Sequence, residues 1–280
     1  MKPFEVWLLK FGIWALLLAF VALASTYAVT TPLFEASDEL WHYPMVKTLA
    51  DGDGLPVQDP ANVGPWRQEG SQPPLYYYLG AAATFWIDTS DVDQIRWLNP
   101  HVDNGVVTPD GNINLAVHTD AEKFPWRGTV LAVRLIRLLS VLMGAGTVYF
   151  TYLIAREIIS DLPGLALVAA AVVAFTPMFL FISGAVNNDN LAVLLSSAIL
   201  WKLIVLVKAG EKESEKAGKW ESEISLLSNL QSLFTNYQLL ITGFLLGLAA
   251  LTKESTLGLF PLAAGVLAYN AFRKWRRWSS

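Results

Sequence analysis

The chain has 280 residues, of which 54% are hydrophobic and only 16% are charged, and its formal net charge is -4. A mean hydropathy of +0.41 is high for a water-soluble domain, and the negative net charge offers no basic surface for nucleic acid. The sequence has no Cys, which excludes disulfides, cysteine nucleophiles and cysteine-based zinc sites. We therefore expect the lipid bilayer, and no nucleic acid, as a partner.

Six apolar segments predict an all-α polytopic membrane protein with about six transmembrane helices. The segments are residues 6–29, 130–154, 165–182, 191–207, 239–251 and 257–271. A helix needs ~20 residues to cross the hydrocarbon core, so the first four segments can span alone and the last two are short. The short pair predicts a hairpin whose apex lies in a polar cavity, with one broken span as the alternative. A cleaved signal peptide is an alternative for the first segment.

Basic residues predict the orientation of these segments. They gather near the N-terminus, after the fourth segment, in a mixed-charge linker and in Arg273–Trp278. The positive-inside rule then places both termini and a loop at 208–237 in the cytoplasm, and a long loop at 30–129 outside. The chain has no Asn-x-Ser/Thr sequon, which favours a bacterial plasma membrane. We expect a single multi-pass module over residues 1–280, with its active face extracytoplasmic.

The loop at 30–129 is too long to lack structure, so it predicts helices lying along the membrane face. Residues 38–54 and 72–87 are the two candidates. In the first helix Asp38, Glu39 and His42 share a broad face, which indicates a carboxylate base or a metal ligand at the membrane surface. The alternative is an ordinary acidic cap at the start of a surface helix.

A second polar cluster precedes the other predicted helix. Glu69 and Gln72 stand just before a run of tyrosines that begins at Tyr76. Aromatic rings beside polar groups indicate a platform that stacks on a sugar. The alternative is an aromatic belt at the membrane interface.

Cations within the apolar segments form further candidate sites. Arg134 and Arg137 lie on one face of the second segment, where paired guanidinium groups suit a phosphate or carboxylate ligand. An internal salt bridge with Asp38 or Asp189 is the alternative. Lys253, in the predicted hairpin apex, is either a phosphate-binding lysine or the partner of its neighbour Glu254.

The turn before the fourth segment carries hard oxygen ligands. Asn188 and Asp189 suit Mg²⁺ or Mn²⁺ if another loop completes the coordination shell. Asn and Asp also make ordinary helix caps, so the motif alone is weak.

Five motifs together resemble the polytopic C-type (GT-C) glycosyltransferases, in particular the group similar to protein mannosyltransferases and aminoarabinose transferases (glycosyltransferase family 39). They are DELWHYPMVKTLADG, QPPLYYYL, RLIRLLSVLMGAGTVYFTYLIAREI, VNNDNL and GLAALTKESTLGLFPL, in this order. The resemblance implies transfer of a sugar from a polyprenyl-phosphate donor to an acceptor outside the cytoplasm, usually with inversion.

By position, the acidic pair of that family matches Asp38 and Glu39, with Asp38 as the general base. The resemblance makes Arg134, Arg137 and Lys253 candidates to bind the leaving phosphate, and it leaves a divalent cation at Asn188 and Asp189 in doubt. Such enzymes are usually longer, so we expect a fragment, one half of a split enzyme or a relic. The alternative function is a noncatalytic membrane subunit that assembles with partner helices. An ion-coupled transporter is a third interpretation, but it would need a polar path through all the spans.

Overall fold

The protein is described by a computed structural model that covers residues 3–61, 63–102, 113–217 and 224–278. The described residues are helical and contain no strand longer than a single bridge between Leu98 and Ala116. The long helices are α1 (Pro3–Thr30), α5 (Gly128–Ile158), α8 (Asp189–Ala217), α9 (Ile224–Ala250) and α10 (Leu259–Trp278). Five of the six apolar segments therefore lie mainly in these long helices, and the third, residues 165–182, is divided between two shorter ones.

Shorter helices connect the long ones. Between α1 and α5 lie α2 (Glu39–Ala50), the 3-10 helix η1 (Arg67–Ser71), α3 (Leu75–Thr84), α4 (Val92–Ile95) and the 3-10 helix η2 (Asp120–Glu122). Between α5 and α8 lie α6 (Gly164–Ala174) and α7 (Pro177–Ser183), and η3 (Glu254–Gly258) precedes α10. The helices predicted within 38–54 and 72–87 are thus confirmed as α2 and α3.

Length and composition allow four of the described helices to cross a membrane, or five if α6 and α7 form one span. The third apolar segment is bent by 66° between α6 and α7. Pro177 is the first residue of α7, and its ring has no N–H with which to continue the preceding helix. The described helices thus support a multi-pass membrane protein.

The outer faces of the long helices are apolar. Only 17% of the apolar window of α1 is buried, and its Trp14 and Leu18 side chains are 63% and 71% exposed. Large exposed apolar side chains on a long helix would be unfavourable in water and are favourable in lipid. This pattern fits a helix at the edge of a membrane bundle.

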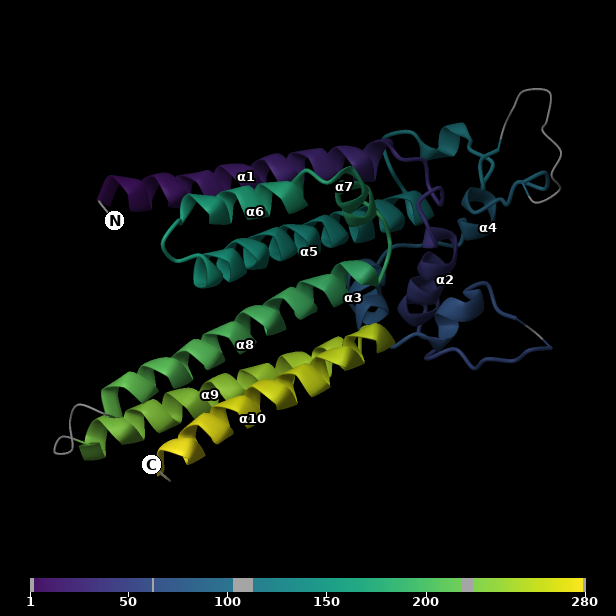
Figure 1. The fold of residues 1–280 in the computed structure, drawn as a ribbon. Helices are drawn as coiled ribbons and strands as arrows, with labels where there is room; N and C mark the ends of the chain where they lie inside the picture. Colours follow the sequence, from purple (N-terminus) through teal and green to yellow (C-terminus); the bar gives the residue numbers. More distant parts are fainter. Residues whose placement is uncertain (1–2, 62, 103–112, 218–223, 279–280) are drawn as a thin grey trace.

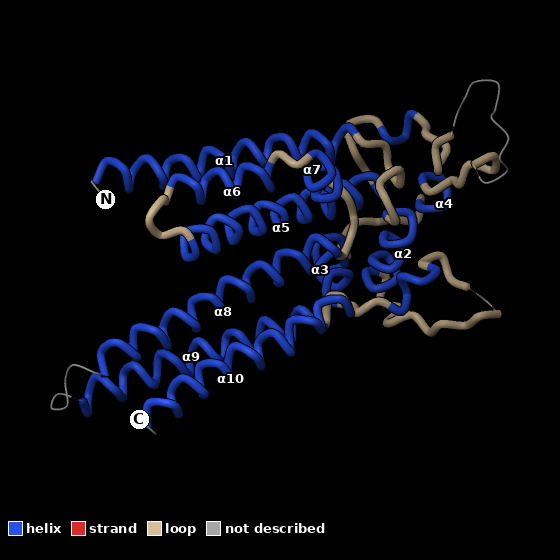
Figure 2. Tube along the Cα trace, in the orientation of Figure 1, coloured by secondary structure: helices blue, strands red, loops and turns tan. Residues whose placement is uncertain are grey.

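All the short helices of residues 31–127 gather at one end of the bundle, as Figure 1 shows. Both termini lie at the opposite end (Figure 1). Helix α5 occupies the centre and packs against α1, α6 and α8, while α9 packs against α8. In Figure 2, α9 and α10 run in opposite directions beside α8, as a hairpin does and a single broken span does not. The apex of this hairpin lies at the end where α2 and α3 are found.

Candidate active site

Asp38 lies at the start of α2 with its side chain exposed. Its backbone is left-handed, with φ of 59°, a conformation that Asp tolerates better than most residues. Its carbonyl accepts hydrogen bonds from the N–H groups of Trp41 and His42, but its carboxylate makes no capping bond to α2. Ser37 Oγ donates to Asp38 Oδ2 at 3.3 Å. The carboxylate therefore does not serve as the helix cap that was the alternative interpretation.

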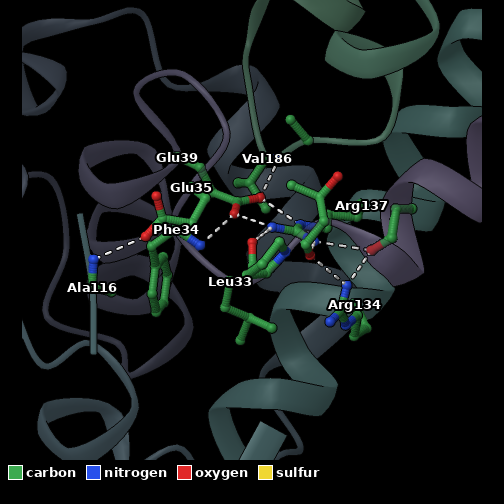
Figure 3. A network of polar contacts seen from close by, with 12 residues as sticks. Leu33, Phe34, Glu35, Glu39, Ala116, Arg134, Arg137 and Val186 are labelled. Atoms are coloured by element: carbon green, nitrogen blue, oxygen red, sulfur yellow. Dashed lines mark hydrogen bonds and ion pairs between the residues drawn. The ribbon is translucent and has the colours of Figure 1, made fainter. Parts of the chain in front are cut away.

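Glu39, the next residue, is completely buried and paired with Arg137 (Figure 3). Glu39 Oε1 accepts from Arg137 Nε at 2.7 Å, and Oε2 accepts from Nη2 at 2.5 Å. The backbone N–H groups of Phe34 and Val186 each donate to the same carboxylate at 2.9 Å. One carboxylate thus joins the loop after α1, the start of α2, helix α5 and the segment before α8.

The guanidinium of Arg137 has no N–H left for a substrate. Its five N–H groups are matched by five contacts, two to Glu39 and three to the carbonyls of Ala28, Thr31 and Pro32. These carbonyls belong to the last turn of α1 and the residues after it, where a helix leaves acceptors unsatisfied. The internal salt bridge that was the alternative for Arg137 is therefore present, with Glu39 as its partner in place of Asp38 or Asp189.

Arg134 lies one turn before Arg137 and is also buried. Its Nη1 donates to the carbonyls of Ala28 and Thr31, and its guanidinium lies 5.6 Å from the ring centre of Trp126. Only its Nε is buried without a partner among the described residues. Arg134 thus caps the end of α1 through Nη1, and the phosphate-binding role predicted for it stays a prediction.

His42 forms a buried cluster with Glu69 and Tyr77. His42 Nδ1 lies 2.9 Å from the hydroxyl of Tyr77 and 3.3 Å from Glu69 Oε2. The Tyr77 hydroxyl donates to Glu69 Oε2 at 3.2 Å, so we assign the proton of a neutral His42 to Nδ1. Burial lowers the pKa of His42 to about 4 and raises the pKa of Glu69. Burial also raises the pKa of Tyr77, which keeps its hydroxyl protonated.

The tyrosines of α3 divide between the interior and the surface. The Tyr76 hydroxyl lies 2.9 Å from Ser140 Oγ and accepts from the N–H of Asn187 at 3.0 Å, in a fully buried position. Tyr77 is buried in the histidine cluster, and Tyr78 is 47% exposed. The three rings therefore do not form one stacking platform, and Tyr76 joins α3 to α5 and to the segment before α8.

Lys253 lies close to this histidine cluster although it is far away in the sequence. Its Nζ lies 2.5 Å from Asp189 Oδ1, so its partner is Asp189, and the predicted pairing with Glu254 is not the one observed. After burial, the charges of Asp38, Lys253 and Asp189 are the next influences on the pKa of His42: Lys253 lowers it and the two carboxylates raise it. The charges of Asp38, Asp189 and Lys253 are therefore close enough to shift the pKa of His42, which contacts Glu69 directly.

Two amide side chains near these residues in sequence have buried atoms without a hydrogen bond. Asn188 is completely buried, and neither its Oδ1 nor its Nδ2 has a partner among the described residues. Gln72 ends η1, and its Oε1 is likewise buried and unpaired. Buried amides are normally satisfied, so unpaired ones are candidates for contact with a ligand. Among the described residues, no group of three or more His, Asp or Glu is arranged to hold a metal ion.

Sequence reasoning did not single out Tyr77, which bonds to both His42 and Glu69. The signal that could have found it is the helical spacing of the tyrosine run. Consecutive side chains on a helix point about 100° apart, so the three rings had to face different surroundings. The salt-bridge alternative for Arg137 named Asp38 or Asp189, whereas the observed partner is Glu39 (Figure 3), a pairing that only the fold reveals.

These features define a multi-pass membrane protein with a charged site at one end of its helical bundle. Residues 132–218, which run from α5 to the end of α8, match the family described as dolichyl-phosphate-mannose-protein mannosyltransferase. The glycosyltransferase resemblance is therefore confirmed over this segment, which contains Arg134, Arg137, Asn188 and Asp189. No curated protein and no solved structure shows significant similarity to the chain.

Proposed function

We propose that this protein transfers a sugar from a polyprenyl-phosphate donor to an acceptor hydroxyl, with inversion, at the end of the bundle that carries α2 and α3. The family match supports a donor of the lipid-phosphate-sugar class. The distribution of basic residues supports placing that end outside the cytoplasm and both termini inside it, and we take the membrane to be a plasma membrane.

The exposed Asp38 beside the buried Glu39 is the observation that carries this proposal. The pair Glu39–Arg137 fixes the start of α2, and Asp38 then presents an exposed carboxylate, bonded to the hydroxyl of Ser37, from a rigid position. In the reaction, Asp38 accepts the proton of the acceptor hydroxyl as the oxygen attacks the anomeric carbon. The bond from that carbon to the phosphate oxygen breaks, and polyprenyl phosphate leaves with the electron pair. Glu39 is assigned a positioning role, because both of its carboxylate oxygens are already bound to Arg137 and to backbone N–H groups.

Lys253 is the cation that we assign to the leaving phosphate. Its side chain is 27% exposed and, within the described part of the chain, bound only to Asp189, whereas Arg137 is saturated. A cation placed where negative charge develops lowers the barrier to departure of the phosphate. Gln72 and Asn188, with their unpaired buried amide atoms, are assigned to hydroxyl groups of the substrate. His42 stays neutral at pH 7, so it can hydrogen-bond to a substrate without adding charge.

A divalent cation at Asn188 and Asp189 does not fit this geometry. Asp189 Oδ1 lies 2.5 Å from the ammonium of Lys253, which already neutralises the carboxylate that the metal would need. We therefore route no step through Mg²⁺ or Mn²⁺. Transfer is expected to persist after dialysis against EDTA, and loss of transfer that is restored by added Mn²⁺ would contradict this view.

Transfer of radiolabelled sugar from polyprenyl-phosphate donors, measured in membranes, tests the proposal. Asp38→Asn keeps the left-handed backbone and removes the base, so transfer is expected to fall by about 10²- to 10⁴-fold. The matched control is Asp53→Asn, another exposed aspartate just beyond the same helix, which should leave transfer unchanged. Equal turnover in wild type and Asp38→Asn would refute the assigned base. Absence of turnover in all three, with a second membrane chain copurifying, would favour the noncatalytic subunit.

A further inference from the structure

Two arginines lie on the ring of Trp41, on the outer side of α2. The guanidinium carbon of Arg67 is 3.8 Å from the ring centre, and that of Arg96 is 5.2 Å away. Arg67 is exposed and begins η1 in a left-handed backbone conformation, with φ of 45°. Such a conformation is costly for a residue with a side chain and tends to persist where a site requires it.

The positive charge at Trp41 has little internal compensation. Among the described residues, none gives the Arg67 guanidinium a hydrogen bond or an ion pair. Arg96 donates from Nε to the carbonyl of Leu40 and from Nη2 to that of Pro65, and neither acceptor carries a charge. Burial, and then the charge of Arg67, lowers the pKa of Arg96, and the carboxylate of Asp93 raises it by a smaller effect, so Asp93 offsets only part of the repulsion between the two cations. A bound anion would remove this repulsion.

The Trp41 site is separate from the position of Lys253. Side-chain contacts between α2 and η1 include those of His42 with Glu69 and of Trp41 with Arg67. Trp41 and His42 are consecutive in α2, so their side chains leave the helix about 100° apart. Arg67 lies on the ring of Trp41, whereas Lys253 is paired with Asp189, so we assign a separate phosphate to each of the two cations.

We propose that Arg67 and Arg96, held on Trp41, bind a phosphate-type oxyanion within one helical turn of Asp38. Arginine forks on an aromatic face bind phosphate in a planar, directional way that lysine does not reproduce. If the proposed transfer is right, which this assignment of the anion assumes, the anion belongs to the acceptor, since Lys253 faces the donor phosphate. The acceptor class would then be a hydroxyl compound that also carries a phosphate.

Phosphorus-31 line broadening of glycerol 3-phosphate tests the site without requiring catalysis. The full chain is purified in dodecyl maltoside, whose micelles contain no phosphorus. Wild type should broaden the line in a saturable way, and Arg67→Gln should weaken binding by about tenfold. Arg67→Lys should recover only part of this loss. Lys123→Gln, which removes another exposed cation of the same loop region, should bind as wild type does.

Doping the micelles with phosphatidylglycerol distinguishes the two sources of the anion. Competition by phosphatidylglycerol and not by phosphatidylcholine would assign the site to a lipid headgroup, and absence of competition would assign it to a soluble phosphate ester. Both results support an oxyanion site. Unchanged broadening in Arg67→Gln, or an equal loss in Lys123→Gln, would overturn it. The assay measures binding alone. A protein without transferase activity can therefore still bind the anion here, and an active transferase can lack this site, so the two proposals are tested independently.

Discussion

Two neighbouring regions at the same end of the bundle differ in how completely their polar atoms are buried and hydrogen-bonded. Around Glu39 and Arg137, every N–H of the guanidinium is matched by an acceptor, and both side chains are completely buried. Around Asp38, Asn188 and Lys253, polar atoms are exposed, unpaired or held by a single partner. The difference separates residues that hold the site together from residues to which we assign contact with a substrate.

Arg137→Met should produce the largest loss of stability. It would leave the charge of Glu39 buried without a partner, which costs about 3–5 kcal/mol. We expect a much lower yield of folded protein and a lower apparent melting temperature, measured by fluorescence-detected size exclusion after heating. The double variant Glu39→Gln with Arg137→Met removes both charges and should be more stable than Arg137→Met alone. A single variant that melts like wild type would contradict the structural role of the pair.

His42 should make stability depend on pH in the acidic range. Its pKa is lowered from 6.5 to about 4 in the folded protein, so the unfolded chain binds more protons between these values. Stability therefore falls as pH decreases through this window, by about 3 kcal/mol once pH is below the folded pKa. Between pH 7 and pH 4, the melting temperature of His42→Gln should fall by less than that of wild type. The opposing titration of Glu69 is present in both proteins, so equal losses would refute the assignment.

Lys253→Gln should affect transfer more than folding. Removing the cation assigned to the leaving phosphate is expected to lower kcat/KM for the donor by about tenfold or more. The matched control is Lys208→Gln. Lys208 is also partly exposed and paired with a carboxylate, that of Glu157, but it lies toward the opposite end of α8. A similar decrease in both variants would show that the effect comes from general charge and not from the position of Lys253.

Asn188→Leu should give the smallest change in stability, and this change should stabilise the protein. Neither polar atom of the buried amide has a partner among the described residues, so an apolar side chain of similar size should stabilise the protein by about 1 kcal/mol. Transfer should nevertheless decrease if the amide contacts substrate. A destabilised variant would mean that Asn188 belongs with Glu39 and Arg137 as a structural residue.

Much of the fold could be predicted from the sequence, because it rests on local patterns. The apolar segments became helices, and Asp38 marked the start of α2, with acidic residues at its beginning and Gly52 just after its end. The bend between α6 and α7 was missed, because Thr176–Pro177 lies in a segment whose other residues are all apolar and which was therefore predicted as one helix.

The pairings within the site could not be predicted, since each depends on contacts between distant parts of the chain. Asp38 and Glu39 are adjacent acidic residues with almost the same sequence context, and only the left-handed turn at Asp38 sends one outward and the other to Arg137. Lys253 lay next to Glu254 in the sequence but pairs with Asp189 because α8 and α9 pack together.

The N–H of Leu75, at the start of α3, donates to the carbonyl of Leu251, just after α9, at 2.8 Å. This single bond ties an early segment of the chain to a very late one, and Lys253 follows two residues later. Ribosomes release the N-terminal part first, so α1 to α8 enter the membrane before the lysine has been made. The growing chain therefore carries the proposed base, Asp38, well before it acquires Lys253, the cation that we assign to the leaving phosphate. The proposed site is complete only once the α9–α10 hairpin has been inserted.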